Sequence, residues 1–176
     1  LRENYKYFLQ QVIPVAEEND IKMAVHSDDP PWNLFGLPRI VNNKESLQKI
    51  VDMVDSPSNC LTVCTGSLGS NPNNDILDIV DHFSKIDRIA FMHIRNIKFA
   101  KPGMFYEGAH LTEEGDINIY KVLEILHKNG YIGLIRPDHG RMIWNENGRP
   151  GYGLYDRALG AAYMVGIIEA LEKSGK

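Results

Sequence analysis

The chain has 176 residues, of which 43% are hydrophobic and 24% are charged, and its formal net charge is −4. These values fit one globular domain and exclude a disordered or collagen-like chain. The basic excess of a nucleic-acid-binding protein is missing, and no apolar run approaches the ~20 residues that span a bilayer. We therefore expect neither a nucleic-acid partner nor a membrane-embedded protein.

Hydrophobic spacing predicts that helices and short strands alternate along the first half of the chain. In order, the pattern predicts a helix at residues 5–19, a strand at 21–26, a loop at 27–41, a helix at 44–54, a strand at 61–64 and a loop at 65–70. Asn43 directly precedes the second of these helices, where an asparagine side chain is a favourable N-cap.

The second half continues the same alternation. It predicts a helix at 75–83, a strand at 89–93, a long loop at 95–115, a helix at 118–128, a strand at 132–136, a glycine-rich loop and a helix at 155–173. Asn74 is the predicted N-cap of the first of these helices. Strands that alternate with helices favour a parallel α/β sheet.

Four strand–helix units are too few to close an eight-unit barrel, which needs roughly 250 residues. The chain is therefore either a small open α/β sheet or half of a barrel. It opens with Leu1 in a helix-like stretch, which indicates a piece of a longer polypeptide.

Cys64 ends the strand predicted at 61–64 and Cys60 directly precedes it, so both could lie on one extended strand. At about 3.3 Å per residue their Cα atoms would lie roughly 13 Å apart, which exceeds the ~7 Å limit for a disulfide. We therefore expect unpaired thiols and a cytoplasmic protein.

Each predicted strand is followed or ended by a side chain that can bind a metal ion. The four residues are His26, Cys64, His93 and Asp138. Because ligands bind at the carboxyl ends of parallel strands, this set predicts a site for a divalent transition metal. Taken singly, each has an ordinary structural explanation: a hydrogen-bonded histidine, a small buried cysteine or an aspartate that begins a turn.

Further candidates lie in the loops around these strand ends. His139 follows Asp138 and has a side chain suited to general acid or base catalysis. Asp28 and Asp29 are candidates to hold His26 or to bind substrate hydroxyls, and Arg95 has the fork geometry that binds a carboxylate. Each of these is also compatible with an ordinary solvent-facing loop residue.

Two other segments add weaker signals. Ser67 lies in a glycine-serine turn that could cradle a phosphate or hydroxyl group, although such turns are frequent. The segment 104–111 holds Glu107 and His110 and is predicted to act as a lid over the active face.

Several of these segments together resemble the mannonate dehydratase family of the hexuronate pathway. The matching motifs are His-Ser-Asp-Asp-Pro-Pro at 26–31, Phe-Gly-Leu-Pro-Arg-Ile at 35–40, Cys-Thr-Gly-Ser at 64–67, Glu-Gly-Ala-His-Leu at 107–111, Arg-Pro-Asp-His-Gly at 136–140 and Pro-Gly-Tyr at 150–152. The family is similar to xylose isomerase in having a TIM-type (β/α)8 barrel. The resemblance implies that residues 1–176 form a single domain that supplies the C-terminal four β/α units of such a barrel.

The resemblance implies a hydro-lyase that converts D-mannonate into 2-keto-3-deoxy-D-gluconate with Mn²⁺ or Fe²⁺. His26, Cys64, His93 and Asp138 match the metal positions. His139 and Tyr152 match the residues expected to transfer protons. It also implies a small sugar-acid substrate and a homo-oligomer in which the N-terminal half of the barrel lies outside this chain.

Two alternatives remain open at this point. One is a metal-dependent sugar isomerase or epimerase on the same barrel. The other is a non-catalytic α/β module that binds a sugar acid or a metal. The cysteine among the ligand positions and the Arg-Pro-Asp-His-Gly segment favour the dehydratase.

Overall fold

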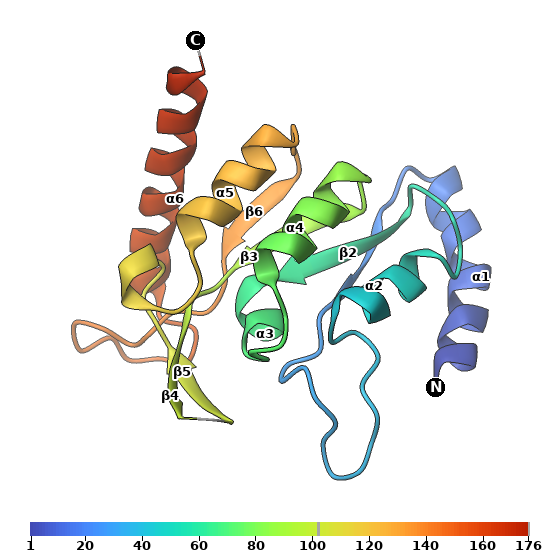
Figure 1. Ribbon diagram of the computed structural model, residues 1–176, viewed down its shortest axis with the longest axis horizontal. Helices are drawn as coiled ribbons and strands as arrows, with labels where there is room; N and C mark the ends of the chain where they lie inside the picture. The colour runs from blue at the N-terminus through green and yellow to red at the C-terminus, as the bar shows by residue number, and fades with distance from the viewer. Residues whose placement is uncertain (102, 176) are drawn as a thin grey trace.

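The computed structural model describes residues 1–101 and 103–175 and contains a four-stranded parallel sheet (Figure 1). The strands are β1 (Met23–His26), β2 (Asn59–Cys64), β3 (Ile89–Ile94) and β6 (Leu134–Pro137), in the spatial order β1-β2-β3-β6. Each strand therefore pairs with the next parallel strand along the chain, as in a barrel. All four predicted strands are present.

Helices lie before, between and after the strands of the sheet, as the alternation predicts. They are α1 (Arg2–Glu18), α2 (Lys44–Val51), α3 (Thr65–Gly69), α4 (Ile76–Lys85), α5 (Ile119–Lys128) and α6 (Leu154–Ser174), with a 3₁₀ turn at Thr112–Glu114. Figure 1 shows α2, α4 and α5 in front of the sheet, with α1 and α6 at its two sides.

The predicted N-cap of α2 is confirmed, because the Asn43 side chain accepts a hydrogen bond from the Ser46 amide. The predicted cap of α4 is wrong by one residue. Asp75 accepts from the Asp78 amide, whereas the Asn74 side chain donates to the carbonyls of Asn42 and Leu68. Asn74 thus ties two loops together instead of capping the helix.

Two segments predicted as loops contain regular structure. Residues 65–69 form the short helix α3, whose N-cap is the sulfur of Cys64. The predicted loop at 95–115 contains an antiparallel hairpin of β4 (Ile97–Lys101) and β5 (Met104–Glu107). The Asp116 carboxylate accepts from the Phe99 amide, so part of the hairpin's stability comes from a contact beyond it in sequence.

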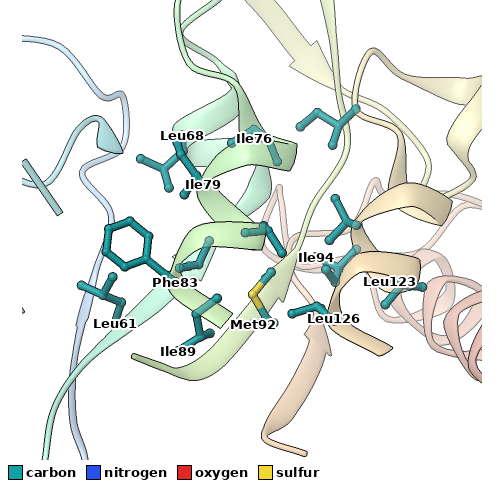
Figure 2. Packing of buried hydrophobic residues seen from close by; sticks show 14 of the residues in the cluster. Leu61, Leu68, Ile76, Ile79, Phe83, Ile89, Met92, Ile94, Leu123 and Leu126 are labelled. Carbon is teal, nitrogen blue, oxygen red and sulfur yellow. The ribbon is translucent and has the colours of Figure 1, made fainter. Parts of the chain in front are cut away.

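The hydrophobic core lies between the sheet and the helices that cover it (Figure 2). Leu61 and Met92 project from the strands and pack against Ile79 and Phe83 of α4 and Leu126 of α5, all of them buried. Strand β2 is buried along its whole length, while the outer strands β1 and β6 are partly exposed, because each pairs with one strand only among the described residues.

Parallel pairing brings the carboxyl ends of all four strands to one edge of the sheet. The loop after β1, helix α3, the β4–β5 hairpin and the loop after β6 gather at this edge (Figure 1). Cys60 and Cys64 lie together on β2 and are unpaired, as their spacing predicts. Across residues 1–101 and 103–175, no helix is both long and apolar enough to cross a bilayer.

Replacing Phe83 by alanine is expected to lower the free energy of unfolding by about 3–5 kcal/mol, because the ring is fully buried between α4 and the sheet. Urea unfolding of the full-length protein measures this loss. Lys128→Ala on the exposed surface of α5 is the control, with an expected change within ~0.5 kcal/mol. A Phe83→Ala protein as stable as the control would show that this core is packed differently.

Candidate metal centre

Four side chains from four different strand ends converge on one point. The ligand-type atoms of His26, Cys64, His93 and Asp138 all lie within 4.8 Å of one another. The sheet register explains the convergence: Cys64 pairs directly with His93, and the Asp138 amide donates to the carbonyl of Ile94. Three of the four side chains are buried, and His26, on the edge strand β1, is exposed.

The two imidazole rings present nitrogen atoms to each other. Nδ1 of His26 lies 2.6 Å from the backbone carbonyl oxygen of Ser27, and Nε2 lies 3.1 Å from Nδ1 of His93. A carbonyl only accepts, so Nδ1 of His26 carries the hydrogen and, in the neutral ring, Nε2 offers a lone pair to the centre. A backbone partner that selects the tautomer in this way is typical of histidines that bind metal ions.

The other two groups add a sulfur atom and a carboxylate to the set. The Cys64 sulfur lies 3.7 Å from Oδ2 of Asp138 and accepts from the Ser67 amide at 3.4 Å. Oδ1 of Asp138 accepts from the Arg136 guanidinium at 2.5 Å, which leaves Oδ2 directed at the centre.

The charges around Asp138 keep it ionised. Burial raises the pKa of Asp138, but hydrogen bonds from His93 and Arg136 outweigh burial and hold that pKa well below its usual range. Burial lowers the pKa of His93, and its hydrogen bonds with Asp138 and Cys64 reverse the effect, so the net shift is upward. Both shifts reflect a site in which anionic and nitrogen ligands face each other at short range.

The donor set fits a divalent transition-metal ion. Two imidazole nitrogens, one sulfur and one carboxylate oxygen make four ligands of the kinds that such ions accept. Three of the ligand residues are themselves held by further hydrogen bonds. Ser27 orients His26, the Ser67 amide contacts the Cys64 sulfur, and Arg136 binds Oδ1 of Asp138. These residues could therefore hold the ion and leave coordination positions for a substrate.

His139 and Tyr152 lie together beside this cluster. Their ring centroids are 5.9 Å apart, and Nε2 of His139 lies 3.9 Å from Oδ2 of Asp138. Nδ1 of His139 lies 2.9 Å from Oε1 of Glu107. Tyr152 is about half exposed, and the guanidinium of Arg149 lies over its ring at 4.9 Å. The two groups predicted to transfer protons are thus neighbours.

Among the predicted substrate-binding residues, Arg95 and Ser67 are engaged within the chain. Arg95 is 3% exposed and forms ion pairs with Asp29 and Glu107. Ser67 is fully buried, and its hydroxyl donates to Asp29. Their role toward a substrate stays a prediction.

Asp28 and His110 also make contacts within the chain. Asp28 accepts from the Val41 amide and pairs with Arg39, and among the described residues no hydrogen bond joins it to His26. His110 is buried, with Nε2 3.3 Å from the Asp138 carbonyl oxygen and Nδ1 without a hydrogen-bond partner in the described part of the chain. Burial lowers the pKa of His110. Substrate binding by either residue stays a prediction.

The structure adds two ion-pair contacts that the sequence did not predict. Arg136 contacts Asp138, and Asp29 contacts Arg95. Arg136 stands two positions before Asp138 on β6, a spacing that puts both side chains on one face of an extended segment. That spacing could have indicated the contact between Arg136 and Asp138. The contact between Asp29 and Arg95 joins two loops that are distant in sequence, and no local pattern predicts it.

Comparison with known proteins places these features in context. A family model described as D-mannonate dehydratase (UxuA) matches residues 1–176. The mannonate dehydratase of Lactococcus lactis subsp. cremoris is 58% identical over 176 residues, which cover 99% of this chain and 49% of that protein. The chain spans about half the length of the curated relatives that it matches.

Solved structures agree with the sequence comparison. The crystal structure of mannonate dehydratase from Streptococcus suis serotype 2 superposes with a TM-score of 0.95 at 45% identity, covering 98% of this chain and 50% of that one. A xylose isomerase-like TIM-barrel protein from Mycobacterium smegmatis, in complex with magnesium, superposes at 0.72 with 15% identity, covering 97% of this chain and 51% of that one, and shows the fold alone. The predicted TIM-type α/β class, with this chain supplying about half of a barrel, is confirmed.

Replacing Cys64 by serine in the full-length protein is expected to weaken binding of a divalent metal by at least ~10-fold, because a hydroxyl is a far poorer ligand than a thiolate. Metal content after dialysis, measured by mass spectrometry, reports the loss. Cys60→Ser is the matched control: Cys60 lies on the same strand but donates to the Pro57 carbonyl, away from the cluster. Equal metal content in the two variants would refute Cys64 as a ligand.

Proposed function

The chain belongs to the D-mannonate dehydratase family, and on that premise we propose that the full-length protein removes water from D-mannonate to give 2-keto-3-deoxy-D-gluconate. The observation that supports this activity best is the convergence of four ligand-type side chains beside His139 and Tyr152. A dehydration next to a carboxylate needs charge stabilisation and two proton transfers, and this edge of the sheet offers groups for both.

We assign His26, Cys64, His93 and Asp138 as the residues that hold Mn²⁺ or Fe²⁺. When bound, such an ion acts as a Lewis acid toward negative charge that develops on the substrate carboxylate. Arg136 keeps Asp138 ionised and directs its free oxygen inward. Ser27 keeps the Nε2 lone pair of His26 available.

His139 and Tyr152 are assigned to the two proton transfers. One of them takes the proton from C2, and the other gives a proton to the C3 hydroxyl as the C3–O bond breaks and water leaves. The resulting enol then loses the proton of its C2 hydroxyl and gains a proton at C3, which gives the 2-keto acid. The 5.9 Å ring separation allows both residues to reach adjacent carbons of one substrate. Arg149 puts positive charge close to the phenol of Tyr152.

Arg95, Ser67, Asp28 and His110 are kept as proposed substrate-binding residues. Arg95 already binds Asp29 and Glu107, so a substrate carboxylate would have to displace one of these partners or bind beside them. Two of these residues also hold neighbouring segments in place, because Ser67 donates to Asp29 and His110 lies against the Asp138 carbonyl.

The setting of the reaction is also a proposal. We propose that residues 1–176 form the C-terminal half of a single barrel domain in a longer cytoplasmic polypeptide, and that the full-length protein assembles as a homo-oligomer. The matched relatives are about twice as long, which supports the first part.

Full-length protein loaded with Mn²⁺ is expected to convert D-mannonate into a 2-keto-3-deoxy acid. His139→Asn and Tyr152→Phe are each expected to lower turnover by about 10²–10⁴-fold, because each removes one proton-transfer group. Detection of the 2-keto-3-deoxy product by a colorimetric assay measures this directly.

Incubation with neutral ketoses separates the dehydratase from a sugar isomerase or epimerase, since only dehydration of an aldonate gives that product. Wild-type turnover in both variants would contradict the assignment of His139 and Tyr152. Tight binding of mannonate without any product would instead support a non-catalytic binding module.

A further inference from the structure

Glu107 lies between a fixed cation and a residue of the proposed catalytic pair. Its carboxylate accepts from Nε of Arg95 at 2.9 Å and from Nη2 at 2.5 Å, while Nδ1 of His139 lies 2.9 Å from Oε1. Glu107 is the last residue of β5, so the hairpin carries this carboxylate to the edge of the candidate metal centre.

Burial and several hydrogen bonds fix the position of Arg95, so that it supports Glu107 rigidly. Its side chain is almost fully buried, its Nη1 donates to Asp29 at 2.5 Å, and its backbone amide donates to Oγ1 of Thr65 at 2.9 Å. The aliphatic part of the side chain passes over Gly66, where an added Cβ would lie 2.4 Å from Cδ of Arg95. A glycine is therefore required at position 66 for this path of the arginine.

The contact with Glu107 determines which nitrogen of His139 faces the centre. An ionised carboxylate only accepts hydrogen bonds, so Nδ1 of His139 carries a hydrogen and Nε2 points toward Oδ2 of Asp138, 3.9 Å away. The backbone of His139 adopts a φ of +58°, in the left-handed region that non-glycine residues seldom occupy. Such a conformation persists where surrounding contacts hold it.

We propose that Glu107 is a positioning residue for His139, anchored by Arg95, and that it presents Nε2 as the atom through which His139 exchanges a proton. This inference rests on the proposed function. In many enzymes a catalytic base is oriented by a hydrogen bond to a third group. Glu107 plays this part for His139, and Arg95 in turn holds Glu107.

Ionisation of Glu107 agrees with this role. Burial raises the pKa of Glu107, but hydrogen bonds from His139 and Arg95 outweigh it and lower the pKa overall. The carboxylate therefore stays an acceptor at neutral pH and does not compete as a proton donor.

The alternative is that Glu107 only anchors the β4–β5 hairpin. A double-mutant cycle separates this structural role from the positioning of His139. Glu107→Ala, His139→Asn and the double variant are made in the full-length Mn²⁺-loaded protein, and kcat and KM for D-mannonate are measured. Glu107→Ala is expected to lower kcat by about 10–100-fold with KM within ~3-fold. In the His139→Asn background the same change is expected to cost less than ~3-fold, because the group being positioned is already missing.

Asp116→Ala is the matched control. Asp116 also anchors the hairpin, through Lys98 and the Phe99 amide, but does not contact His139. Its kcat is expected within ~3-fold of the wild type. Equal losses for Glu107→Ala with and without His139 would overturn the proposal. If Glu107→Ala does not fold, Glu107→Gln takes its place in the same cycle and is judged by the same coupling.

A spectroscopic readout keeps the inference testable without turnover. In ¹⁵N-histidine NMR of the full-length Zn²⁺-loaded protein above about pH 8, the His139 signal, identified by its loss in His139→Asn, is expected to show a protonated Nδ1. In the Glu107 variant it is expected to move toward the Nε2-protonated form. An unchanged signal refutes the positioning role, whereas a wild-type protein that shows the expected signal but no dehydration refutes only the proposed function.

Discussion

The structure depends on one constraint: parallel strands that pair in sequence order end at the same edge. His26, Cys64 and His93 end or nearly end neighbouring strands, and Asp138 follows the fourth. Residues up to 112 positions apart in the chain therefore meet within 4.8 Å without any long-range pattern in the sequence. The buried core of β2, β3, α4 and α5 holds these ends in place, so the geometry of the centre depends on the packing of this core.

Polar and charged groups around the centre are arranged in two layers. The inner layer holds the thiol and the Asp138 carboxylate, and the outer layer holds Arg136 and the Asp29–Arg95–Glu107 ion-pair network. Buried charges are tolerated when each has a partner. Here Arg136 also contacts Asp138, and Glu107 also contacts His139. The hairpin that carries Glu107 is therefore more than a cover: it connects the outer layer to the proposed proton-transfer pair.

The sequence predicted the sheet, most helices and the four strand-end residues, because strand and helix periodicity are local signals. It did not predict α3, whose cap is a cysteine sulfur, or the β4–β5 hairpin, which is stabilised in part by Asp116 from beyond the turn. It placed the α4 cap on Asn74, since Asn74 and Asp75 are equally good caps and only tertiary contacts distinguish them. It did not predict the ion pairs of Arg95 with Asp29 and Glu107, because these two carboxylates come from other segments of the chain.

X-ray absorption spectroscopy of the full-length protein loaded with one equivalent of Mn²⁺ tests the central claim most directly. We predict a first shell that contains one sulfur together with imidazole nitrogens and carboxylate oxygen, as His26, Cys64, His93 and Asp138 require. A shell made only of oxygen atoms, with neither sulfur nor imidazole scattering, would contradict it.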